Sequence, residues 1–127
     1  MQAIIVVGLG GFLGSILRYG LGRISVAGDF PLMTMLINIL GSFIIGVVAE
    51  LAKDKTAVSP NTVLFLQTGL LGGFTTFSAF SLETMVLFQE NKYLAGSTYA
   101  ILTVILCFTG TILGMLAGKT IKSKLIS

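Results

Sequence analysis

The sequence predicts an all-α integral membrane protein with four transmembrane helices, the third of which is broken near its middle. Of the 127 residues, 54% are hydrophobic and 10% are charged, whereas a soluble domain carries roughly a quarter charged residues. The apolar residues fall into about four stretches of the roughly 20 residues that a transmembrane helix needs. Within the third stretch, two adjacent glycines interrupt the helical pattern.

The helices are expected over about 3–21, 32–51, 62–88 and 94–118, and they form a single domain over residues 1–127. Polar turns separate them, and Ser59-Pro60-Asn61 suits a helix start. A basic tail, KTIKSK, follows the fourth helix. The first helix lacks the basic segment that precedes the apolar core of a signal peptide, so we expect it to be retained.

Small residues on the first and fourth helices predict close helix packing. Gly10 and Gly14 have the GxxxG spacing, and Gly110, Gly114 and Gly118 repeat it. In a bilayer such residues let two backbones approach closely. A dinucleotide site is excluded, because no strand precedes the first glycines and their spacing does not match the fingerprint.

The second helix carries a polar stripe spaced by four residues: Thr34, Asn38, Ser42, Gly46 and Glu50. An amide within a membrane helix faces either another helix or a wet cavity, so Asn38 is either packing glue or part of a solute path. The fourth helix has a similar line of Tyr99, Thr103, Cys107 and Thr111. There we expect the threonines to bond their own helix backbone.

Ionisable residues avoid the membrane centre. The chain has no histidine, and its acidic residues lie near helix ends and in loops. Glu83 and Arg18 are the two that can line a vestibule, the arginine by extending along its apolar stem. A proton-coupled transporter usually needs a carboxylate within the membrane, so this pattern favours a passive path. No enzyme site and no nucleic-acid surface is expected.

The topology count is nearly balanced. With four spans, the side that holds both termini carries five lysines and the other side carries Arg18, Arg23 and Lys92. The positive-inside rule then leaves two alternatives open: one fixed orientation, or insertion in both orientations with pairing of inverted copies.

The interruption in the third helix, GGFTTFSAF, has its own chemistry. Adjacent glycines favour a kink, and freed backbone at membrane depth must be buried or line water. Thr76 and Ser78 add hydroxyl donors, and Phe77 and Phe80 face nearly the same way. A ring edge is positive, so it can approach an anion without a full charge. The alternative is a kinked helix with core phenylalanines.

GGFTTFSAF, together with NILGSF and GSILRYGL on the preceding helices, resembles the Fluc/CrcB family of fluoride channels over essentially the whole chain. The resemblance implies an antiparallel, dual-topology homodimer with two fluoride pores. It implies a structural sodium ion at the dimer centre, held by the carbonyls of Gly72 and Thr75. The motif positions that would serve the pore are Phe77, Phe80, Asn38, Ser78 and Arg18. Ala79 departs from the family, which often has a hydroxyl residue there.

Together with these observations, the resemblance implies a fluoride-selective passive channel of the bacterial cytoplasmic membrane, a multi-pass protein that exports fluoride and so protects the cell. Its partners would be fluoride, a second copy of the chain and the bilayer. Two alternatives are a four-helix, proton-coupled exporter of the small multidrug kind and a non-transporting membrane assembly subunit.

Overall fold

The structure, a computed structural model, describes residues 1–26 and 28–127. All regular structure in this part of the chain is helical. Four helices are long and apolar enough to cross a membrane: Gln2–Gly22, Leu32–Ala52, Pro60–Gln89 and Tyr93–Ile126. The predicted all-α class with four membrane-crossing helices is therefore confirmed.

The third span is divided into several elements. It comprises α3 (Pro60–Val63), the π-helix η1 (Leu64–Leu71), α4 (Gly72–Phe74) and α5 (Phe77–Gln89), and it follows α1 (Gln2–Gly22) and α2 (Leu32–Ala52) and precedes α6 (Tyr93–Ile126). The span begins at the predicted helix start, Ser59-Pro60-Asn61. The Ser59 side chain accepts a hydrogen bond from the Thr62 N–H at 3.2 Å, and Pro60 occupies the first turn, where its missing N–H costs nothing.

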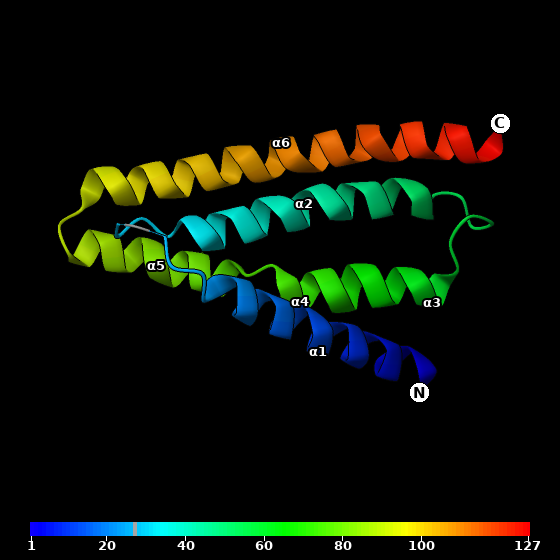
Figure 1. Cartoon of the computed structure of the whole chain (residues 1–127), viewed down its shortest axis with the longest axis horizontal. Helices are drawn as coiled ribbons and strands as arrows, with labels where there is room; N and C mark the ends of the chain where they lie inside the picture. The colour runs from blue at the N-terminus through cyan, green and yellow to red at the C-terminus, as the bar shows by residue number, and fades with distance from the viewer. Residues whose placement is uncertain (27) are drawn as a thin grey trace.

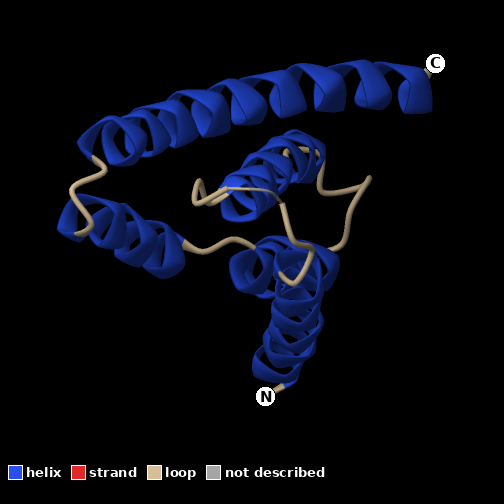
Figure 2. Ribbon diagram, turned by 60° about the vertical axis from the view of Figure 1, so that its left-hand side comes forward, coloured by secondary structure: helices blue, strands red, loops and turns tan. Residues whose placement is uncertain are grey.

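The four spans form two packed pairs, α2 with α6 and α1 with the third span, and the last part of the third span also contacts α6. α2 lies along α6, and α1 lies against η1 and α4. Figure 1 shows both termini at the same end of the molecule, and Figure 2 shows α1 running away from α6 at a steep angle. The α5 segment lies beside the first part of α6, so the third span joins the two pairs.

Glycines form the contact surfaces of both pairs. A Cβ on Gly10 would lie 2.5 Å from the carbonyl oxygen of Phe65, and one on Gly14 would overlap the carbonyl oxygen of Leu70. On the other pair, a Cβ on Gly114 would overlap the carbonyl oxygen of Phe43. The predicted packing role of these glycines is confirmed, because backbone meets backbone at each of them.

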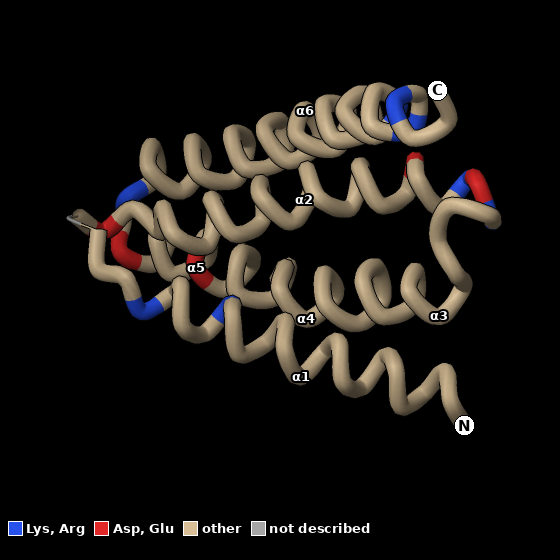
Figure 3. The backbone as a smooth tube through the Cα atoms, turned by 45° about the vertical axis from the view of Figure 1, so that its right-hand side comes forward, with Lys and Arg blue, Asp and Glu red and all other residues tan. Residues whose placement is uncertain are grey.

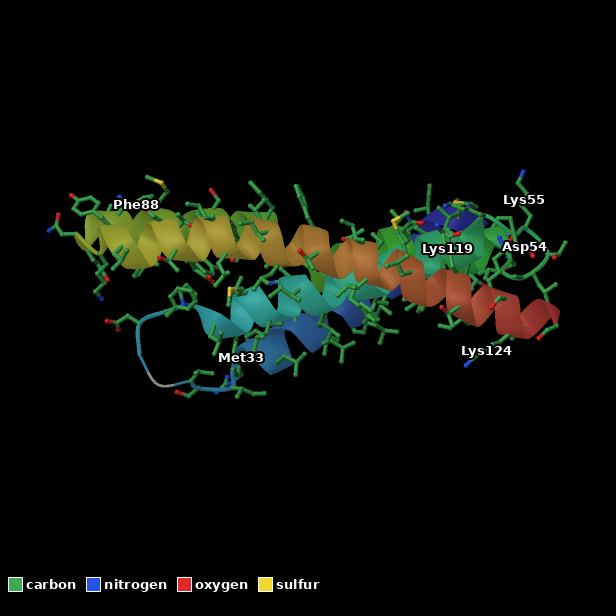
Figure 4. All side chains as sticks on the ribbon, turned by 90° about the horizontal axis from the view of Figure 1, so that it is seen from above. Met33, Asp54, Lys55, Phe88, Lys119 and Lys124 are labelled. Carbon is green, nitrogen blue, oxygen red and sulfur yellow. The ribbon has the colours of Figure 1, made fainter. Side chains whose placement is uncertain are left out.

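Apolar side chains cover the outside of the bundle and charges gather at its ends. Large side chains such as Phe12 and Leu13 on α1 and Leu116 on α6 are exposed, as suits surfaces that meet lipid. Charged residues cluster toward the two ends of the tube in Figure 3. Asp54, Lys55, Lys119 and Lys124 all lie at one end, as Figure 4 shows.

The fourth helix is longer than the expected span. It continues through the basic tail to Ile126 rather than ending near Gly118. Gly118 is buried, and a Cβ there would lie 2.7 Å from the Glu50 Cβ, so this glycine serves packing and not a helix end. No glycine or proline follows it, and lysines are good helix formers.

The glycine contacts predict a sharp difference between two positions on α1. Gly14→Ala should lower stability by about 1–3 kcal/mol, the usual cost of overpacking, because its methyl group would meet the η1 backbone. Gly8→Ala should have almost no effect, since nothing lies within 4 Å of a Cβ there. Thermal unfolding of the purified proteins in detergent measures both, and equal melting temperatures would contradict the packing.

Candidate functional site

The third span loses its helical backbone at two residues. Thr75 has φ −83° and ψ 155°, and Thr76 has φ −147° and ψ 117°, both extended, before the helix resumes at Phe77. The glycine pair that drew attention in the sequence precedes this point and is helical. Gly73 instead permits close packing, since a Cβ there would lie 2.6 Å from the Gly11 carbonyl oxygen. β-branched threonines favour the extended conformation.

Asn38 pairs with the extended backbone through both ends of its carboxamide. Its Nδ2 donates to the Thr76 carbonyl oxygen at 3.0 Å, and its Oδ1 accepts from the Thr76 N–H at 2.8 Å. The side chain is only 8% exposed. The amide therefore replaces the helical partners that Thr76 lacks, which an apolar surrounding makes necessary. Gly41 leaves room nearby, because a Cβ there would overlap the Thr75 methyl group.

Neighbouring groups satisfy most of the remaining backbone. The Thr75 N–H and hydroxyl both donate to the Leu71 carbonyl oxygen at 2.9 Å. Arg18 on α1 donates its Nε to the Gly73 carbonyl oxygen at 3.0 Å. The Thr76 hydroxyl accepts from the Ala79 N–H at 3.1 Å and so caps α5. Among the described residues, the carbonyls of Gly72 and Thr75 accept no hydrogen bond outside regular helix.

A pocket of about 340 Å³ opens beside the interruption, between α2, the third span and α6. Six of the predicted site residues line it: Asn38, Gly72, Thr75, Thr76, Phe77 and Phe80. None of its lining residues is Asp, Glu, Lys or Arg. The pocket thus combines hydroxyl and amide groups with aromatic rings and carries no full charge.

The phenylalanines belong to a row of rings that meet edge to face. The centroids of Phe77 and Phe80 are 5.5 Å apart at 83°, and those of Phe80 and Tyr99 are 5.3 Å apart at 88°. Phe80 is 7% exposed and Phe77 is 81% exposed. Each ring is held in the T-shaped arrangement that directs an electropositive edge at its neighbour, so Phe80 is fixed while Phe77 is available to another surface.

Three expected site residues lie outside the pocket lining. Ser78 is exposed, with its hydroxyl 3.3 Å from that of Thr76. Glu83 lies between three helices and accepts from the Thr34 and Tyr99 hydroxyls, each at 2.8 Å. Arg18 is held at the interruption by its bond to Gly73. Their proposed roles stay predictions.

One polar lining residue, Gln67, was not predicted from the sequence. Gln67, on η1, lines the pocket, and no polar stripe pointed to it. On α6, Thr111 does bond its own helix, to the Cys107 carbonyl at 3.1 Å, as expected. Thr103 does not follow that expectation, since its hydroxyl has no partner among the described residues. Tyr99, in the same stripe, donates to Glu83. The four-residue spacing of Tyr99, Thr103, Cys107 and Thr111 was the sequence feature that could have placed this face of α6 at the pocket.

Comparison with known proteins gives a consistent result. The model of the family described as "CrcB-like protein, Camphor Resistance (CrcB)" matches residues 5–115. A protein of Ruminiclostridium cellulolyticum named "Fluoride-specific ion channel FluC" is 44% identical, over 97% of each chain. Proteins with the same name from Chlorobium chlorochromatii and Rhizobium meliloti are 40% and 43% identical over 91% of this chain and 92% and 94% of theirs. The family resemblance noted in the sequence is therefore confirmed.

The paired bonds of Asn38 predict that it matters for stability. Asn38→Ala leaves the Thr76 N–H and carbonyl without partners, and each buried unsatisfied group costs about 1–3 kcal/mol. Ser42→Ala, on the same face of α2, should change little, because the Ser42 hydroxyl makes no hydrogen bond in the described part of the chain. Thermal unfolding distinguishes the two, and an Asn38→Ala protein as stable as Ser42→Ala would refute the pairing.

Proposed function

This chain belongs to the CrcB-like protein family, and from that premise we propose that it is a fluoride-selective channel, not an enzyme, through which the anion crosses the membrane passively. The observation that carries the proposal is the uncharged pocket beside the helix interruption, lined by Asn38, Thr76, Phe77 and Phe80. The three relatives described above, each named a fluoride-specific ion channel, support the choice of ion.

The pocket's chemistry suits a small, strongly hydrated anion. Such an ion gives up water only where other donors replace it, and a fixed cation would hold it too tightly to let it leave. The Asn38 carboxamide has a second N–H beyond the one bonded to Thr76, and the rings of Phe77 and Phe80 offer positive edges. Ser78 and Thr76 are weaker hydroxyl donors in this proposal. Arg18 and Glu83 would shape the field at the vestibule.

The proposal includes an antiparallel homodimer of dual topology with two pores. The exposed ring of Phe77 supports it, because an aromatic side chain beside a polar pocket suits contact with a second copy better than contact with lipid. The exposed Phe108 ring lines the same pocket, so a second copy could also close its open side. The break in the third span, with Thr75 and Thr76 extended, would then lie near that of the partner.

A structural sodium ion at the centre of this dimer fits the residues present. The carbonyls of Gly72 and Thr75 accept no hydrogen bond outside regular helix in the described part of the chain, and carbonyl oxygens are suitable ligands for a hard cation. One of each from two subunits would hold the ion. Its charge would neutralise oxygens that neither broken helix can satisfy alone.

We place the channel in a bacterial cytoplasmic membrane, where an interior-negative potential would drive fluoride out and so protect the cell. Of the alternatives, a proton-coupled drug exporter would need a carboxylate on the first helix, and α1 contains no Asp or Glu. A non-transporting assembly subunit would show no ion movement in the assay described next.

The first prediction concerns ion movement itself. Proteoliposomes containing the protein should release fluoride under an imposed potential and retain chloride, as an ion-selective electrode for each anion would report. Equal release of the two anions would reject selectivity. No release from well-folded dimer would favour the assembly subunit.

The second prediction concerns the fixed ring. Phe80→Ile removes the ring edge from the pocket and should slow fluoride efflux by about twofold to tenfold, which corresponds to about 0.5–1.4 kcal/mol. Phe12→Ile is the matched control, because Phe12 lies on the outer face of α1 and is 64% exposed. Efflux through the Phe80→Ile dimer that matches the control would remove the ring from the mechanism.

The third prediction concerns sodium. If sodium binds the dimer at the breaks, saturating sodium should raise the thermal stability of the purified protein by about 2.7 kcal/mol at a hundredfold excess over the dissociation constant. A large organic cation at equal ionic strength should not do so. Identical melting curves in the two salts would exclude the structural ion.

A further inference from the structure

The pocket lining includes polar side chains that the proposed role of the phenylalanines does not use. Gln67 comes from η1, Ser42 from α2, and Thr103 and Cys107 from α6. The three helices therefore each turn a polar group toward the same space.

The π-helix explains how Gln67 reaches the pocket. In an α-helix residues advance by about 100° each, so residues five apart, such as Gln67 and Gly72, would point about 140° away from each other. A π-helix bonds residue i to i+5 and brings them closer to the same face. Both residues do line the pocket, and a Cβ on Gly72 would lie 3.8 Å from the Gln67 carbonyl oxygen. Single π-turns inside α-helices are often found at functional sites.

Two of these polar side chains lack protein partners. The Thr103 side chain is 4% exposed, and its hydroxyl has no hydrogen-bond partner in the described part of the chain. Gln67 is half-buried, and its carboxamide takes part in none of the side-chain hydrogen bonds found there. A buried polar group without a partner is costly, and this applies to the Thr103 hydroxyl. The Gln67 carboxamide lines the same pocket and is free to bind a small polar ligand.

We propose that Gln67 is a further pore residue, whose carboxamide donates N–H groups to fluoride at a second subsite beside η1. This proposal rests on the proposed function. A neutral carboxamide can replace water around the anion without trapping it. Conduction benefits from successive weak sites, and Gln67 extends the series that starts at Asn38 and Phe80.

The test is fluoride efflux from proteoliposomes by variants of one position. Gln67→Met keeps an unbranched side chain of similar length but removes the donors, and we expect efflux to fall about tenfold, or about 1.4 kcal/mol. Gln67→Glu keeps the shape, and at mildly alkaline pH its carboxylate should repel the anion and lower efflux further. Thr68→Val is the matched control, because Thr68 is the adjacent residue of η1, is exposed and does not line the pocket.

The outcomes separate this inference from the function on which it rests. An unmodified protein that releases no fluoride defeats the proposed function. An unmodified protein that conducts while Gln67→Met conducts equally well overturns the Gln67 subsite alone. Gln67→Glu at the unmodified rate would also overturn it, since only packing would then matter. The subsite is also overturned if Gln67→Met lowers total efflux only because less of the protein is dimeric on size-exclusion chromatography, while the efflux rate of each dimer is unchanged. If Gln67→Met does not fold, the shape-preserving Gln67→Glu carries the test.

Discussion

The fold depends on one exchange of hydrogen bonds, between the Asn38 carboxamide and the backbone of Thr76. A helix cannot stop inside a bilayer unless its freed N–H and carbonyl groups find other partners. Asn38 supplies a donor and an acceptor from a neighbouring helix, much as a β-strand would. Because both Thr76 groups are satisfied, Thr75 and Thr76 can remain extended, and the Thr76 hydroxyl is free to cap α5.

The interruption has consequences for everything around it. It sets the direction in which α5 restarts, and with it the row of edge-to-face rings from Phe77 through Phe80 to Tyr99. It also opens the uncharged pocket between α2, the third span and α6. Close glycine contacts hold the two helix pairs on either side, so the extended residues lie within a rigid frame. Rigid donors that cost no reorganisation are what a pathway for a strongly hydrated anion needs.

Much of this could be predicted from the sequence, because the bilayer imposes simple rules. Apolar length gave the four helices, and glycine spacing gave the contact surfaces at Gly14 and Gly114. The polar stripe on α2 pointed to Asn38, but it did not reveal whether the amide contacts a helix or a cavity, and it does both. The glycine pair suggested the position of the interruption, yet the extended residues are Thr75 and Thr76. Gln67 was not predicted because the π-helix that orients it changes the spacing of residues on a face. The α-helical spacing used to read the sequence therefore does not place it at the pocket.

The central claim is that fluoride passes through the pocket beside Phe80 and Asn38. Solid-state NMR of the protein in lipid bilayers with fluoride tests it directly, through magnetisation transfer from ¹⁹F of the bound anion to nearby side-chain protons. The account predicts transfer to the Phe80 ring and the Asn38 amide and none to the outward-facing ring of Phe12. A protein that conducts fluoride but shows no transfer to any pocket residue would contradict it.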